Sequence, residues 1–181
     1  RRDNWDTHYQ ELADYMLPRK ADIVRKRSRG EKRMELIFDG TAIHAAELLS
    51  ASLHGMLTNA STAWFSLRYT ENELNSEDEA MEWLQGVEDV MYQAYNRSNF
   101  QEQIHELYSD LVTFGTAVIF IENNNDDGFR FSTRHIAECY VSENEQGRVD
   151  TVFRKYKTTA RAAVRQFGEQ EVTQRIAKLN E

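Results

Sequence analysis

The spacing of the apolar residues changes at Gly115, and this change limits the folds that the chain can adopt. Before Gly115 most apolar residues recur every three or four positions, which is the period of an amphipathic helix. After it they form short runs or alternate with polar residues, as strands do. Helices followed by strands favour an α+β fold over a repeated βαβ order. We therefore expect N-terminal helices packed against a small antiparallel β-meander, with a short C-terminal helix.

Two helices are predicted in the first part of the chain. One covers residues 5–17 and ends before Pro18. The other begins near Thr41, which we expect to cap it, and continues to about residue 57. Small residues near its start would let another backbone approach closely. The residues expected on the apolar faces are Trp5, Tyr9, Leu12, Ala13 and Met16 in the first helix, and Ala42, Ala45, Ala46, Leu49, Leu53, Met56 and Leu57 in the second.

A short strand and two more helices are predicted before Gly115. Residues 64–69 alternate large apolar and polar side chains, as a strand does. Ser76 and Glu79 form a capping box at the start of a helix over 76–96. Asn99 and Glu102 form a second capping box at the start of the following helix. The expected inward residues are Ala80, Leu84, Val87, Met91 and Ala94 in the former helix, and Phe100, Ile104, Leu107, Leu111 and Phe114 in the latter.

Strands dominate the next part of the chain. Residues 117–121 form a continuous apolar run, which is typical of a strand covered on both faces. After a turn at 123–128, residues 129–132 alternate. A short strand is expected at 139–141, a turn at 144–147 and a longer strand at 149–156. Thr159 can cap a final helix, in which Ala163, Val164 and Phe167 are the candidates for burial.

Residues 19–33 carry eight basic residues against two acidic ones and show little periodicity, so we expect a mobile arm or loop. The chain is treated as one domain in four parts. Residues 1–70 contain the N-terminal helices, the basic loop 19–33 and a short strand. Residues 71–115 form a helical pair, residues 116–157 antiparallel strands and residues 158–181 a helical end. Because the chain starts without Met and closes within a helical pattern, we expect it to be part of a longer protein.

Composition excludes several classes of protein. Apolar residues make up 40% of the chain and aromatic residues 11%, which suffices for a core. No apolar run approaches the roughly 20 residues that span a bilayer, so no membrane partner is expected. A net charge of −8 argues against a surface coated in basic groups for nucleic acid. A single cysteine, Cys139, excludes an internal disulfide framework and a multi-cysteine zinc site.

Charge is distributed in blocks along the chain. Residues 1–33 carry ten basic and six acidic groups, a net of +4, and residues 71–110 carry eleven acidic groups against Arg97, a net of −10. Residues 148–178 hold eight basic and three acidic groups, a net of +5. Two interpretations stay open, a solvated acidic helix face and an acidic face that meets a basic face of an identical neighbour. The interface candidates are Glu77, Asp78, Glu79, Glu82, Glu88, Asp89, Arg154, Lys155, Lys157, Arg161 and Arg165.

Only one short motif is typical of catalysis. Glu102 and His105 are three residues apart on one helix face, as two of the ligands are in di-iron carboxylate bundles. A second such pair is missing, because His44 and Glu47 have the reversed order. His54 lies ten residues after His44 and points about 80° away from it. Cys139 has no base near it in the sequence, and no nucleophile, phosphate-loop or zinc-protease motif occurs. We therefore expect no enzyme, no cofactor and no metal.

The basic stretch, residues 19–33, contains candidates for contact with nucleic acid. Arg25, Lys26, Arg27 and Arg29 are candidates for non-specific phosphate contacts. No aromatic residue lies among them, and the remainder of the chain (residues 34–181) has 12 basic and 24 acidic groups. Specific recognition of nucleic acid is not expected, while transient contact with a nucleic acid or an acidic neighbour stays open.

Three segments in the same order resemble one protein family. The first is residues 38–67, with Phe38-Asp39-Gly40-Thr41-Ala42 and Trp64-Phe65-Ser66-Leu67. The second is residues 100–121, with Asp110-Leu111-Val112-Thr113-Phe114-Gly115. The third is residues 149–167, with Asp150-Thr151-Val152-Phe153-Arg154-Lys155. Together they resemble podovirus portal proteins, also called head-to-tail connecting proteins. The resemblance extends over about residues 5–167.

The resemblance implies the N-terminal part of the wing region of a portal subunit. Such subunits form a ring, typically of twelve copies, at one vertex of the phage capsid. The ring docks the terminase, passes double-stranded DNA during packaging and ejection, and seats the tail. The implied location is the virion, with the host cytoplasm during assembly. Two alternatives remain, another virion adaptor or scaffold subunit, and a helical metal-carboxylate enzyme that uses Glu102 and His105.

Overall fold

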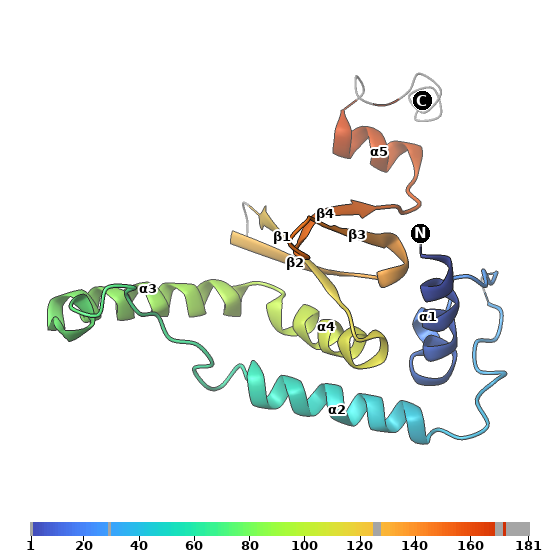
Figure 1. Cartoon of the computed structure of the whole chain (residues 1–181), viewed down its shortest axis with the longest axis horizontal. Coiled ribbons are helices and arrows are strands. Elements are labelled where there is room, and N and C mark those ends of the chain that lie inside the picture. Colours follow the sequence, from blue (N-terminus) through green and yellow to red (C-terminus); the bar gives the residue numbers. More distant parts are fainter. Residues whose placement is uncertain (1, 29, 125–127, 169–171, 173–181) are drawn as a thin grey trace. The chain divides into compact units, whose positions relative to one another are not determined.

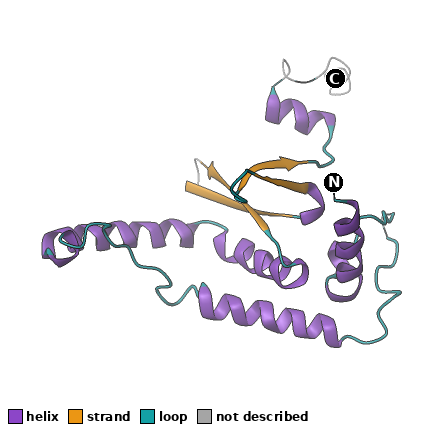
Figure 2. Ribbon diagram, in the orientation of Figure 1, coloured by secondary structure: helices purple, strands orange, loops and turns teal. Residues whose placement is uncertain are grey.

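The computed structural model describes residues 2–28, 30–124, 128–168 and 172. Within these residues four α-helices precede the strands along the chain and one follows them. Figures 1 and 2 show this segregation of helices and strands, and the predicted α+β class is confirmed. The elements are α1 (Asp3–Met16), α2 (Thr41–Leu57), α3 (Asp78–Arg97), α4 (Phe100–Phe114), β1 (Val118–Asn124), β2 (Gly128–Arg134), β3 (Cys139–Glu143), β4 (Val149–Arg154) and α5 (Ala160–Phe167), with short 3-10 helices at Pro18–Lys20, Leu74–Ser76 and Ile136–Glu138.

Four of the five predicted strands are present, as two separate antiparallel pairs. β1 pairs with β2 from Val118 opposite Arg134 to Asn124 opposite Gly128. β3 pairs with β4 from Cys139 opposite Arg154, with an irregularity next to Ser142. The first pair belongs to a compact unit of residues Arg1–Ala137 and the second to a unit of residues Glu138–Glu181.

Helix α4 is the centre of the first unit, between α2 and the β1–β2 pair (Figure 1). Its apolar stripe places Phe100, Ile104 and Tyr108 in a buried cluster with Phe131 of β2. The Phe100 ring also stacks on Trp64, with ring centroids 5.5 Å apart and planes 8° apart. Since each of these rings is large, this cluster supplies much of the unit's buried apolar area. The stripe predicted from helical spacing is thus confirmed at Phe100, Ile104 and Phe114, while Leu111 is 40% exposed.

The contact between α2 and α4 uses small residues. Ala46 and Ser50, one turn apart on α2, are buried, and the Ser50 hydroxyl donates to the Ala46 carbonyl at 2.7 Å. The expected close approach therefore occurs through Ala46, which was predicted to face inward, and through Ser50, which was not. Leu49 and Met56, predicted to point inward, are exposed.

Helix α4 ends where its sequence predicts. Gly115 has φ +70°, the left-handed conformation that glycine adopts without strain, and its N–H donates to the Leu111 carbonyl at 2.8 Å. This left-handed residue directs the chain out of the helix and toward β1.

Strand β1 is not covered on both faces, contrary to the prediction from its apolar run. Phe120 is 48% exposed and Ile121 54% exposed. Phe120 lies on the open face, because β1 belongs to a two-stranded sheet that packs on α4 through Ile119 and Phe131 on the other face.

Asn99 precedes α4, but its predicted capping role is wrong. Its side-chain amide bonds the backbone of Phe131 instead, donating to the carbonyl and accepting from the N–H at 2.9 Å each. Gln103, one turn later, accepts from the Thr133 N–H at 2.7 Å. These contacts tie α4 to the edge of β2.

Two other predicted caps differ in the structure. Ser76 ends a 3-10 helix, and α3 begins at Asp78 with no side-chain cap at the preceding residue. At α2 the capping acceptor is Asp39, whose carboxylate accepts from the backbone N–H and the hydroxyl of Thr41. The predicted Thr159 cap of α5 is confirmed, because its hydroxyl accepts from the Ala162 N–H at 3.2 Å.

Residues 64–69 are extended but do not form the predicted strand. The N–H groups of Trp64 and Phe65 both donate to the Tyr92 hydroxyl at 2.8 Å, and the Leu67 N–H donates to Glu88 at 3.0 Å. Side chains of α3 thus provide the hydrogen bonds that a neighbouring strand would have provided.

The basic stretch is irregular, as predicted, but it is not a free arm. The buried side chain of Gln10 accepts from the N–H groups of Ile23, Val24 and Arg25 at 2.9–3.1 Å, and its amide nitrogen donates to the Ala21 carbonyl. Ala21 itself is fully buried in a cluster with Tyr9, Ala13, Phe114 and Ile136. The start of the stretch therefore contributes to the core of the first unit.

Candidate subunit-interface surfaces

The acidic interface candidates lie along the outer face of α3 and just before it. Five of them are exposed, and no ion pair to them is found within the described ranges. The sixth, Glu88, is half-buried and accepts the Leu67 N–H. The exposed residues are Glu77, Asp78, Glu79, Glu82 and Asp89.

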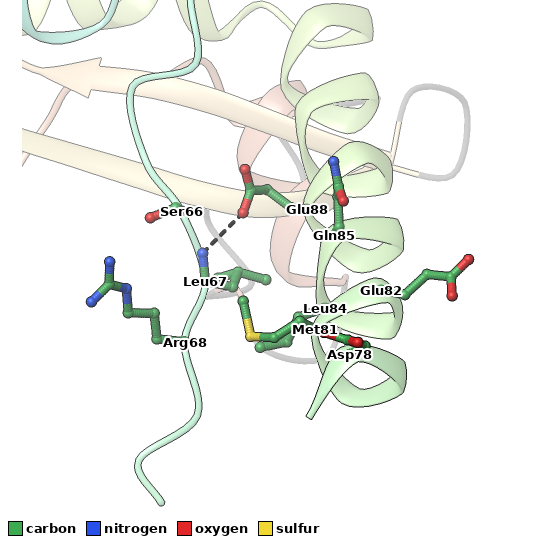
Figure 3. A pocket seen from close by; sticks show the side chains of 9 residues that line it. All are labelled: Ser66, Leu67, Arg68, Asp78, Met81, Glu82, Leu84, Gln85 and Glu88. Carbon is green, nitrogen blue, oxygen red and sulfur yellow. Dashed lines mark hydrogen bonds between the residues drawn. The ribbon is translucent and has the colours of Figure 1, made fainter. Parts of the chain in front are cut away.

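A groove of about 460 Å³ separates α3 from the extended segment 64–69 (Figure 3). Leu67, Met81 and Leu84 lie in its middle, while Glu82 points away from the segment and Arg68 points away from the helix. Glu88 points to the Leu67 N–H that it binds. No set of ionisable side chains converges in this groove, so its geometry is that of a packing cleft.

Two large apolar side chains share the acidic face. Trp83 and Val90 are each 64% exposed, and both lie outside the inward-facing row that contains the buried Leu84. Neither residue is among the interface candidates predicted from the sequence, although helical spacing alone places both off the inner row. These two side chains are the apolar part of the candidate acidic surface.

The basic interface candidates lie in the second unit. Arg154 is held within that unit, because its guanidinium donates to Glu138 at 2.9–3.0 Å and lies 3.9 Å from the Tyr156 ring centroid. The exposed candidates, for which the described part of the unit provides no ion-pair partner, are Lys155, Lys157, Arg161 and Arg165.

The candidates for phosphate contact differ in the exposure and the ion-pair partners of their side chains. The Arg27 side chain is 8% exposed and lies 3.4 Å from both Asp14 and Asp22. Arg25 is half-exposed and lies 3.5 Å from Asp14, and Lys26 is exposed. Arg29 lies outside the described residues.

An ionic network joins the basic stretch to α4. The Lys20 ammonium lies 2.7 Å from Glu106 and 2.5 Å from Asp110, and Arg19 lies 2.7 Å from Glu106. The Asp110 side chain is 1% exposed, and its Oδ2 atom has no hydrogen-bond partner among the described residues. Burial raises the pKa of Asp110, and the bond from Lys20 offsets this only in part. Burial alone would also raise the pKa of Glu106, but the bonds from Lys20 and Arg19 lower it below its ordinary value.

Glu102 and His105 do not lie in a larger set of ligands. The His105 ring centroid is 5.5 Å from that of His54, whose Nε2 atom lies 2.7 Å from Gln101. His105 also lines a groove of about 330 Å³ between α1, α2 and α4. Among the described residues, no three His, Cys, Asp or Glu side chains are grouped so that they could hold a metal ion.

None of the described helices is both long and apolar enough to cross a bilayer.

Comparison with known proteins gives three similarities. A family model described as "Bacteriophage head to tail connecting protein" matches residues 1–181. The chain is 31% identical over 179 residues to the "Probable portal protein" of Bordetella phage BPP-1, covering 98% of the chain and 32% of that protein. It is 27% identical over 168 residues to the "Portal protein" of Salmonella phage epsilon15, covering 92% of the chain and 30% of that protein. The chain thus spans about a third of the length of these relatives.

Proposed function

The chain belongs to the bacteriophage head to tail connecting protein family, and on this premise we propose that it is part of a portal subunit. The subunit forms a ring at one capsid vertex, through which double-stranded DNA is packaged by the terminase and later ejected. The tail attaches to the same ring. The chain forms the N-terminal share of the wing region of that subunit. The match of the whole chain to the family model is the observation that carries this proposal.

In this role the protein acts by assembly and performs no bond chemistry. Its partners are further copies of itself, twelve in a closed ring, together with terminase, capsid and tail proteins. It resides in the virion and, during assembly, in the host cytoplasm. The low density of positive charge suits a ring that DNA must slide through, because each neutralised phosphate would slow its movement.

The unlike charges of the two units support contact between neighbours. A head-to-tail ring brings two different faces of the same subunit together, so opposite charges on those faces attract. We assign the exposed carboxylates on and before α3 to one face and the exposed basic residues after β4 and on α5 to the other. Glu88 and Arg154, which have partners within their own units, contribute less to this contact.

Electron microscopy of the full-length protein tests the proposal. We expect closed rings with a central hole. Particles that remain monomeric, or that form filaments or compact clusters without a hole, would contradict it.

A further inference from the structure

The outer face of α3 carries a row of residues that the chain's own core does not use. Trp83, Gly86 and Val90 are spaced three and four residues apart and therefore lie in one row along the helix. Trp83 and Val90 are each 64% exposed, whereas Leu84 on the inner side is buried. We call these three residues the outer row.

The packing of the described residues does not require a glycine at position 86. A glycine inside a helix is less stable than alanine, because it loses more backbone freedom on folding. A Cβ atom added at Gly86 would meet no atom within 4 Å, so nothing in the described structure requires its absence. Between two exposed apolar side chains, a missing side chain allows the backbone of a partner to approach the helix closely.

The surroundings of the outer row select a basic partner. Glu79, Glu82 and Asp89 flank it and are exposed. An aromatic ring beside carboxylates is a favourable site for a guanidinium group, which stacks on the ring while it pairs with the acids. The same carboxylates repel phosphate groups, so nucleic acid does not fit this face.

Helix α5 has the matching features. Arg161 and Arg165 are one turn apart and exposed, and both lie opposite the buried Ala163. Ala162 lies between them in the sequence and is also exposed, so this side of the helix combines two long basic side chains with a small one.

We propose that the outer row of α3 binds helix α5 of a second copy of the chain, with Arg161 and Arg165 pairing with Glu79, Glu82 and Asp89 around Trp83. The contact is between unlike faces, so it continues from copy to copy around a ring. The inference rests on the proposed function and specifies which elements of two neighbouring subunits meet.

A charge exchange in the full-length protein tests the pairing. Glu82→Arg with Asp89→Arg should reduce the yield of rings about tenfold, because like charges then face each other. Arg161→Glu with Arg165→Glu should do the same. Combining all four changes should restore most of the yield. Glu71→Arg with Glu73→Arg is the matched control, since these acids are exposed in the same block but lie before α3.

A cross-link tests the contact without depending on ring yield. In a Cys139→Ala background, chains with G86C are mixed with chains that carry A162C and treated with a short bismaleimide. We expect linked peptides that contain positions 86 and 162, which can form only between two chains when each chain has one of the thiols. Wild-type folding of each variant is checked by circular dichroism.

The outcomes separate the inference from the proposed function. Rings without the linked peptides, or without rescue in the four-fold variant, would overturn the inference and leave the ring in place. Linked peptides in a protein that forms no rings would support the contact and overturn the proposed function. Rescue together with linked peptides would support both.

Discussion

Gln10 shows how one polar side chain can order a segment that has no regular structure. The Gln10 Oε1 atom accepts from three successive N–H groups, and its Nε2 atom donates to the Ala21 carbonyl and to Asp14. These contacts convert residues 21–25 from a solvated chain into a turn packed against α1. A buried amide is well suited to this role, because it both donates and accepts.

Replacing Gln10 should therefore destabilise the first unit. Gln10→Met keeps the size of the side chain but leaves three backbone N–H groups without their acceptor, and we expect a loss of about 3 kcal/mol in the free energy of unfolding. Urea denaturation measures the change. Gln85→Met, at an exposed position on α3, is the control and should alter stability by less than about 0.5 kcal/mol. An equally small effect at Gln10 would show that the basic stretch is held by other contacts.

Asp110 should produce a distinctive dependence of stability on pH. Because burial raises its pKa in the folded chain, the folded state holds this proton more tightly than the unfolded state. The contribution of Asp110 to the free energy of unfolding therefore falls as the pH rises from its ordinary pKa of 3.8 through the raised value. Glu106, whose pKa is lowered, contributes the opposite trend.

Asp110→Asn isolates this contribution, since asparagine cannot ionise. The free energy of unfolding of the variant minus that of the wild type should increase with pH over that range and then level off. Denaturation curves at a series of pH values provide the comparison. A difference that is flat, or that decreases with pH, would mean that Lys20 stabilises the carboxylate more than burial destabilises it.

At the scale of an element, the extended segment 64–69 shows what replaces a missing strand. Its sequence alternates as a strand does, yet its hydrogen bonds go to Tyr92, Glu88 and Asn75. The Tyr92 ring also stacks on Phe65, with centroids 4.4 Å apart. The segment is thus held to α3 by side chains, and the groove of Figure 3 lies along it.

Tyr92→Phe tests the hydrogen bonds apart from the stacking. The change removes one hydroxyl group, which accepts from Trp64 and Phe65 and donates to the Phe65 carbonyl at 2.7 Å. We expect a loss of about 2 kcal/mol and faster hydrogen exchange at these two amides. Tyr15→Phe is the control, because Tyr15 is exposed. Unchanged exchange at both amides would show that the stacking alone holds the segment.

At the scale of the whole molecule, the chain combines an acidic helix in one unit with a basic strand end and helix in the other. The carboxylates of α3 have no ion-pair partners among the described side chains, so their charge acts on whatever approaches from outside. In the proposed ring this charge guides the encounter of neighbours. Electrostatic guidance affects the rate of association more than the final affinity.

Ring assembly should therefore slow as salt increases. For full-length subunits, we expect the association rate to fall about tenfold between roughly 0.05 and 0.5 M salt, as screening shortens the range of the charges. Light scattering after mixing follows the rate. The thermal midpoint of the isolated subunit should change little over the same range. A rate independent of salt would contradict the role of the charged faces.

The sequence by itself determined the kinds of element and the family. Helical spacing predicted α4 with its inner residues Phe100 and Ile104, and Thr159 predicted the start of α5. Local propensity, capping and turn formation depend on neighbours along the chain, which is why these features could be predicted. The resemblance to portal proteins, carried by three ordered segments, is confirmed by the family match.

The charged surfaces could be predicted only in outline. The acidic block was visible as a run of carboxylates, but the structure separates exposed Glu82 from Glu88, which binds the Leu67 N–H. It also separates Lys26, which is exposed, from Arg27, which is held by Asp14 and Asp22. Charge counts do not distinguish these cases, because they depend on which groups the fold brings within bonding distance.

Only the tertiary structure decided where the polar side chains bind. Asn99 bonds β2 instead of capping its helix, Gln10 orders a distant turn, and Tyr92 occupies the place of a neighbouring strand. In each case a partly buried backbone group needed a hydrogen-bond partner, and packing placed a side chain from another element within reach of it. The period of a sequence determines which face of an element is apolar, but the partner of each polar group is determined by the elements that pack against it.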